Sequence, residues 1–94
     1  MELNDLVMAA REGAEHVRYP GIQPGGQPYT PGTREADAWL IGAWLVREGG
    51  GRGGYVIGIR RGRAGTYRVE TRKSAMRVKV MDSYDYRCGV QLVD

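Results

Sequence analysis

Residues 66–81, TYRVETRKSAMRVKVM, contain two runs in which mostly apolar and mostly charged side chains alternate, 67–72 and 76–81. Lys73-Ser74-Ala75 separates the runs. Successive side chains of a β-strand point to opposite faces, so a period of two indicates a strand with two different faces. The stretch therefore predicts a β-hairpin with one apolar face and one basic face.

The same period continues on both sides of this hairpin. Residues 55–60 alternate upstream and residues 87–92 alternate downstream, with turns predicted at 61–65 and 82–85. Four short strands joined by tight turns favour an antiparallel meander with one buried face. That face is predicted to carry Tyr55, Ile57, Ile59, Tyr67, Val69, Met76, Val78, Cys88, Val90 and Leu92.

The charges of the chain divide unevenly between its halves. Residues 1–50 hold four arginines against seven acidic residues, a net charge of −3, whereas residues 51–94 hold ten basic against four acidic residues, a net charge of +6. Such asymmetry indicates partners rather than fold. The basic half is either a surface that binds a polyanion or an ordinary solvated face that keeps a small sheet soluble. The candidate binding residues are Arg60, Arg61, Arg63, Arg68, Arg72, Arg77, Lys79 and Arg87.

The acidic half has the pattern of two helices. Apolar residues recur at helical spacing in the first, predicted from Asp5 to His16. Thr33 is predicted to begin the second helix and Gly49 to end it. All four prolines lie between the two helices, in residues 18–32, which predicts a long irregular connection.

These elements predict an α+β fold in which a two-helix hairpin packs on a four-stranded antiparallel meander. Residues 1–48 form the hairpin, 49–54 a Gly-rich linker, and 55–94 the sheet. We expect one compact unit, because each half is too small to bury a core of its own.

The chain offers little for catalysis or for a cofactor. Its one histidine, His16, and its one cysteine, Cys88, could act as a pair only if the fold brought them together. They are too few for a metal site. Asp82 and Asp85 are predicted to serve turn hydrogen bonds. We expect a non-enzymatic protein without cofactor or metal. A single cysteine and the lack of a signal peptide or membrane span favour the cytoplasm.

The segment from Val7 to Arg47 resembles the ribosome modulation factor family of small bacterial proteins. Arg11-Glu12-Gly13 is followed by Gln27-Pro28-Tyr29 and then by Ala38-Trp39-Leu40-Ile41-Gly42-Ala43-Trp44. The resemblance implies a helical hairpin whose motif residues are Gly13, Pro28, Tyr29, Trp39, Gly42 and Trp44. It implies that Gly42 permits close helix approach and that Pro28-Tyr29 pins the loop. Trp39 and Trp44 lie on the apolar stripe of the predicted second helix, so both are expected to pack against the first helix and to be largely buried. In the founding family this unit binds the small ribosomal subunit.

Two functions remain open. The first is a bacterial or phage regulator that binds RNA or a ribonucleoprotein, the ribosome included, through the basic sheet. The second is a small phage-encoded inhibitor, of the anti-CRISPR or another anti-defence type, that blocks a host protein by surface contact. Only Tyr84 and Tyr86 are predicted to be available for base stacking, which favours contacts to the nucleic-acid backbone. The acidic side chains of Glu12, Glu15 and Asp37, with that of Glu35, are expected to stay exposed.

Overall fold

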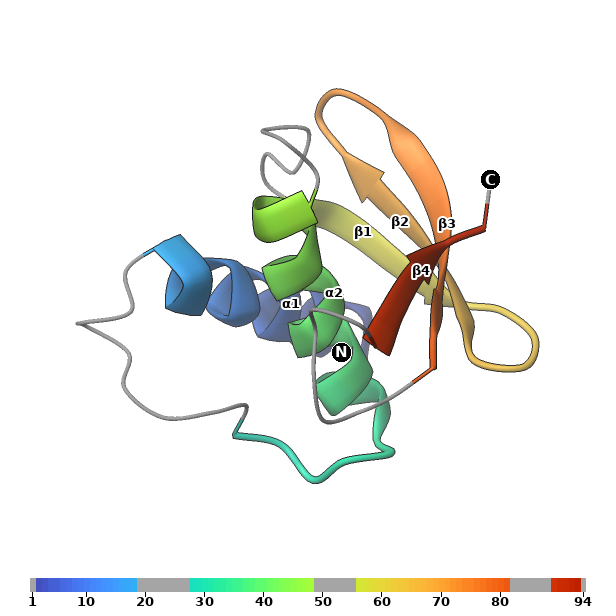
Figure 1. The fold of residues 1–94 in the computed structure, drawn as a ribbon, viewed down its shortest axis with the longest axis horizontal. Helices are drawn as coiled ribbons and strands as arrows, with labels where there is room; N and C mark the ends of the chain where they lie inside the picture. The colour runs from blue at the N-terminus through green and yellow to red at the C-terminus, as the bar shows by residue number, and fades with distance from the viewer. Residues whose placement is uncertain (1, 19–27, 49–55, 82–88, 94) are drawn as a thin grey trace.

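The computed structural model describes residues 2–18, 28–48, 56–81 and 89–93. Two helices lie on one side of a four-stranded antiparallel sheet, which confirms the predicted α+β fold (Figure 1). The elements are α1 (Glu2–Arg18), α2 (Arg34–Glu48), β1 (Val56–Arg61), β2 (Thr66–Thr71), β3 (Ala75–Val80) and β4 (Val90–Leu92).

The sheet is a meander with the strand order β1-β2-β3-β4. Its inner face meets the helices through side chains of all four strands, because each strand directs alternate residues inward. The buried residues are Val56, Ile59, Tyr67, Val69, Thr71, Val78 and Val90. The apolar ones, all except Thr71, pack with buried residues of both helices into one hydrophobic core. The helices and the sheet thus share a core, as the short length of each half requires.

The two helices pack with their backbones in contact. A Cβ atom at Gly13 of α1 would stand 2.0 Å from the carbonyl oxygen of Trp39, and one at Gly42 of α2 would stand 1.8 Å from that of Ala10. Two alanines lie at this crossing, Ala10 against Gly42 and Ala43 against Gly13, and both are fully buried. Small residues at both crossing points let α1 and α2 approach more closely than larger side chains would permit.

The start of α2 follows the predicted capping chemistry. Thr33 precedes the helix, and its hydroxyl oxygen accepts a hydrogen bond from the amide of Ala36 at 3.2 Å. This satisfies one of the amides that the first turn leaves without a partner. Glu35 and Asp37 follow in the first turn, where the helix dipole favours negative charge. The predicted end of α2 at Gly49 lies outside the described residues.

Two polar contacts join the layers. The Tyr67 hydroxyl on β2 donates to Asp37 on α2 at 2.6 Å. The Nε of Arg11 on α1 donates to the backbone carbonyl of Val56 on β1 at 3.2 Å. Each contact links residues at least 30 positions apart in the chain. They fix the orientation of the sheet relative to the helices, beyond what apolar packing does.

The structure corrects several details of the predicted core. The register of β1 and β2 shifts between Val56 and Gly58, so Ile57 is exposed and Val56 is buried, the reverse of the prediction. Such a bulge adds one residue to one strand and reverses the alternation on one side of it. Leu92 is exposed because β4 is a short edge strand.

Other differences concern element ends. The first helix extends beyond the predicted bounds to Glu2 and Arg18. Ala75, predicted in a turn, begins β3. The predictions for Tyr55, Cys88, the linker 49–54 and the turn 82–85 lie outside the described residues. Neither α1 nor α2, the helices that the structure describes, is long and apolar enough to span a bilayer.

Candidate nucleic-acid interface

Three arginines stand opposite one another on the outer face of the sheet. We define the outer face as the side turned away from the helices, which carries Arg60, Arg68, Glu70, Arg77, Lys79 and Gln91. In the register, Arg60 of β1 pairs with Arg68 of β2, and Arg68 pairs with Arg77 of β3. Directly paired residues of an antiparallel sheet share a face and lie about 4.5–5.5 Å apart at Cβ. The three form one row that crosses the strands, called here the arginine row.

Lys79 extends the positive charge of the arginine row by one further position. It pairs with Thr66 on one side and with Gln91 on the other, two residues along β3 from Arg77. All three arginines are exposed and Lys79 is half-buried. The four cations thus gather on one continuous part of the outer face.

Glu70 is the one acidic residue among the described residues of the sheet. It lies two positions from Arg68 on β2, with 3.7 Å between its Oε1 and the Arg68 Nε. Both side chains are about half exposed, 59% for Arg68 and 46% for Glu70. An exposed pair at this distance contributes little, because water and salt screen it. The described outer face therefore retains a net charge of +3, four cations against one carboxylate.

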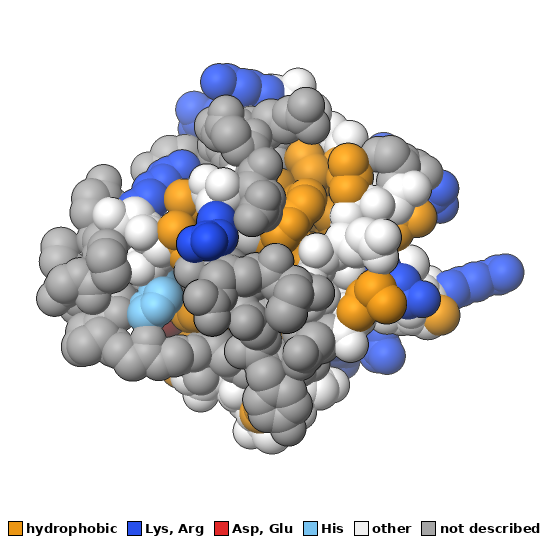
Figure 2. All heavy atoms as spheres, viewed as in Figure 1, with side chains coloured by type: hydrophobic (Ala, Val, Ile, Leu, Met, Phe, Trp, Pro, Cys, Tyr) orange, Lys and Arg blue, Asp and Glu red, His pale blue; other side chains and the backbone are white. Residues whose placement is uncertain are grey.

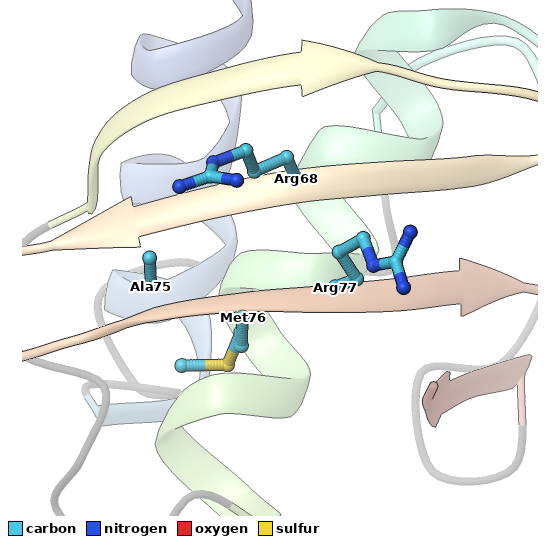
Figure 3. A pocket seen from close by; sticks show the side chains of 4 residues that line it. All are labelled: Arg68, Ala75, Met76 and Arg77. Atoms are coloured by element: carbon cyan, nitrogen blue, oxygen red, sulfur yellow. The ribbon is translucent and has the colours of Figure 1, made fainter. Parts of the chain in front are cut away.

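Arg68 and Arg77 border a shallow open hollow of about 120 Å³ between β2 and β3. Ala75 and Met76 complete its lining. The two guanidinium groups extend in opposite directions along their strands (Figure 3). Ala75, which lines the hollow between them, has a small side chain that fills little of it. The arginine row thus spreads its charge both across the strands and along them. Figure 2 shows several Lys and Arg side chains projecting from the side of the molecule that the sheet occupies and others over the helices, with few acidic side chains among those coloured.

The remaining predicted binding residues are not in this row. Arg61 ends β1 instead of lying in a turn, and it pairs with the inward-facing Tyr67, so it belongs to the opposite face. Arg63 lies in the turn between β1 and β2, and Arg72 in the turn after β2 ends at Thr71. Both are exposed, but neither shares the strand alternation that we predicted for Arg72. Arg87 lies outside the described residues, as do Tyr84 and Tyr86.

The motif residues of the hairpin occupy structural positions. Gly13 and Gly42 form the close helix contact, and Trp39 is buried at 4% exposure. Trp44, predicted to be largely buried, is only half-buried at the border of the core. Pro28 is exposed.

Tyr29, the residue after Pro28, holds the end of the connection against α1. Its hydroxyl donates to the Glu12 carboxylate. This hydrogen bond, together with burial, raises the pKa of Tyr29 to about 12. The predicted anchoring of the loop by Tyr29 is therefore present in the structure.

Two of the acidic residues predicted to be free surface charges accept hydrogen bonds from tyrosines. Glu12 accepts from Tyr29, and Asp37 accepts from Tyr67. Burial, followed by the bond to Asp37, raises the pKa of Tyr67. Sequence reasoning missed both partners because each pair joins distant segments. The one available signal is composition: the chain has six tyrosines and no phenylalanine, and acidic residues outnumber basic ones in residues 1–50.

The structure gives His16 a packing role. Its ring lies against Trp39, with 5.2 Å between the ring centroids at a tilted angle. Aromatic contacts of this kind stabilise a core edge. Within the described residues there is also no group of three or more His, Cys, Asp or Glu residues that could hold a metal ion.

In comparisons with known proteins, the chain matches no family model, no curated protein and no solved structure.

Proposed function

We propose that this protein is a non-enzymatic regulator that binds RNA, free or within a ribonucleoprotein, through the outer face of the sheet. The observation that supports it most is the arginine row, Arg60, Arg68 and Arg77, with Lys79 beside it. The proposal extends to a bacterial or phage setting and to the ribosome as a target through the resemblance of the helical hairpin to the ribosome modulation factor family.

The arginine row is difficult to explain as a purely structural feature. Like charges directly opposite one another in a sheet are destabilising. Solubility alone would be served by mixed charges. A phosphate backbone removes the repulsion, because each cation that meets a phosphate releases condensed counterions. The arrangement is therefore most favourable when a polyanion covers the face.

The chemistry of the face favours contacts to the backbone over the reading of bases. Its cations end in guanidinium and ammonium groups, which bind phosphate oxygens well. Phosphate contacts position a protein on nucleic acid but carry no sequence information. We therefore expect affinities that vary little with RNA sequence.

The proposal is tested by replacing the arginine row. The variant R60S/R68S/R77S removes three exposed arginines from the outer face, and R18S/R34S/R47S removes three exposed arginines from the helices as a control of equal charge. RNA binding is measured by fluorescence anisotropy over a range of salt concentrations. We expect the sheet variant to lose affinity and its salt slope to fall by roughly 2–3 in total, at about 0.7–0.9 for each lost phosphate contact.

Equal losses in the two triple variants would show that net charge, rather than the outer face, determines binding. The rival function, inhibition of a host protein by surface contact, is separated in a pull-down from bacterial lysate with and without nuclease. An RNA-dependent capture disappears with nuclease. A partner that survives nuclease and moderate salt would favour the inhibitor.

A further inference from the structure

We infer that the outer face selects double-stranded RNA over single-stranded RNA and over a DNA duplex. This inference rests on the proposed function and names the form of RNA that the face would bind. Three features of the described outer face lead to it: its side chains, the spread of its charges and its width.

The described outer face has no platform for base stacking. Tyr67, the one aromatic residue of the described strands, points inward and is 1% exposed. The positions that flank the arginine row hold small residues, Gly58 and Ala75 on either side of Glu70. Proteins that bind single strands combine a basic surface with aromatic side chains on which successive bases stack. The described face supplies only the first of these two requirements.

The cations of the outer face are spread widely enough to reach the two phosphate backbones of a duplex. Strands lie about 4.8 Å apart, so the arginine row spans roughly 10 Å across β1, β2 and β3. Arg68 and Arg77 also extend in opposite directions along their strands (Figure 3). A single strand presents one line of phosphates, whereas the two walls of a duplex groove present two. The duplex also has the higher charge density, which gives a stronger counterion term for each contact.

The width of the sheet distinguishes RNA from DNA. The major groove of B-form DNA, about 12 Å wide, admits a helix or a two-stranded ribbon. A four-stranded sheet is at least as wide as that groove and has to lie across it. An A-form RNA duplex instead presents a wide and shallow minor groove, which the broad face of a sheet can approach without entering a deep groove.

The test uses the full chain with three probes of one sequence: a short RNA duplex, one of its strands alone, and the corresponding DNA duplex. Dissociation constants are measured by anisotropy at matched salt. We expect the RNA duplex to bind about tenfold or more tightly than the single strand, and more tightly than the DNA duplex. A second RNA duplex of unrelated sequence should bind equally.

The outcomes separate this inference from the proposed function. A single strand that binds as tightly as the duplex, or a DNA duplex that binds as tightly as the RNA duplex, overturns the inference and leaves RNA binding intact. A failure of all RNA probes to bind at low salt overturns the proposed function. The variant R60K/R68K/R77K, which keeps the charges, should retain the preference for duplex RNA, whereas R60S/R68S/R77S should lose it. A thermal melt of each variant confirms that it is folded.

Discussion

Gly42 on α2 lies directly against the backbone of Ala10 on α1, so close that a Cβ atom at position 42 would stand 1.8 Å from the Ala10 carbonyl oxygen. A reciprocal contact joins Gly13 on α1 to the carbonyl of Trp39 on α2. Because the obstacle in each case is backbone, no side-chain rotation can relieve it. The two glycines therefore set the distance between the helices.

Gly42→Ala should destabilise the protein strongly. Alanine favours a helix by about 1 kcal/mol over glycine, but here it would force the helices apart, at a cost at or above the upper end of the range of about 1–3 kcal/mol for overpacking, so the net loss should be about 2 kcal/mol or more. Chemical denaturation measures the free energy of unfolding. Gly58→Ala is the control, since its new Cβ would meet only ordinary contacts with Glu70 at 3.7 Å and beyond. A Gly42→Ala variant as stable as the wild type would contradict the close helix contact.

The two tryptophans of α2 should differ in importance. Trp39 is 4% exposed and contacts His16, whereas Trp44 is half-buried at the border of the core. Trp39→Ala should lower the free energy of unfolding by about 3–5 kcal/mol, as truncation of a buried aromatic residue does. Trp44→Ala should lower it distinctly less, because less of its surface leaves water on folding. Equal losses in urea denaturation would show that the two side chains are equally buried in solution.

The strand pattern predicted the sheet well where alternation is strict and failed where a bulge interrupts it. Ile59 and Val69 point inward as their period indicates, but Ile57 does not. The bulge lies beside the contact between Arg11 and the carbonyl of Val56, a pair 45 residues apart. A local pattern holds no information on a contact of that range. The one local signal of the reversal at Ile57 is Gly58, because a glycine inside a strand often marks a bulge.

The sequence predicted which side of the sheet carries the basic residues, but it did not predict that the three arginines pair with one another across the strands. Alternation alone placed Arg60, Arg68 and Arg77 on the side opposite the apolar residues. That they stand directly opposite one another depends on the register, which the lengths of the two connecting turns determine. The same limit explains Arg61: the turn begins one residue later than predicted, so Arg61 belongs to β1 and to the inner side.

Stability should fall at alkaline pH through the two bonded tyrosines. The hydrogen bond to Glu12 and burial raise the pKa of Tyr29 to about 12, and burial and the bond to Asp37 raise that of Tyr67. An unfolded tyrosine loses its proton near pH 10. Above that pH the unfolded chain binds fewer protons than the native state, so the free energy of unfolding decreases as pH rises. The contribution of the two tyrosines to the free energy of unfolding is complete below about pH 10 and is lost progressively from about pH 10 to 12 and beyond.

The variant Tyr67→Phe tests this pH dependence. It keeps the ring in the core but removes the bond to Asp37, which should lower the free energy of unfolding by about 1–3 kcal/mol at neutral pH. Its stability should also decline less steeply above pH 10, because one titrating group is gone. An alkaline slope identical to that of the wild type would show that Tyr67 titrates alike in both states. Tyr29→Phe provides the parallel measurement on the contact between the connection and α1.

Repulsion within the arginine row should lower the stability of the protein in low salt, and Arg68→Gln tests this. Arg68 faces a like charge on both sides, Arg60 and Arg77, and each such pair is unfavourable by roughly 0.2–1 kcal/mol. Arg68→Gln keeps a long polar side chain but removes both repulsions, and the ion pair with Glu70 that it loses is exposed and weak. The variant should therefore melt at a higher temperature than the wild type in low salt.

The increase in melting temperature caused by Arg68→Gln should become smaller as salt is added, because at 0.1 M salt ions screen exposed charges over about 10 Å. Lys73→Gln is the matched control: it removes one exposed cation from the neighbouring turn, outside the arginine row. Its melting temperature should stay close to that of the wild type at every salt concentration. A destabilised Arg68→Gln in low salt would show that the arginine row is stabilised by contacts within the protein itself. There would then be no repulsion between the arginines for a bound polyanion to relieve.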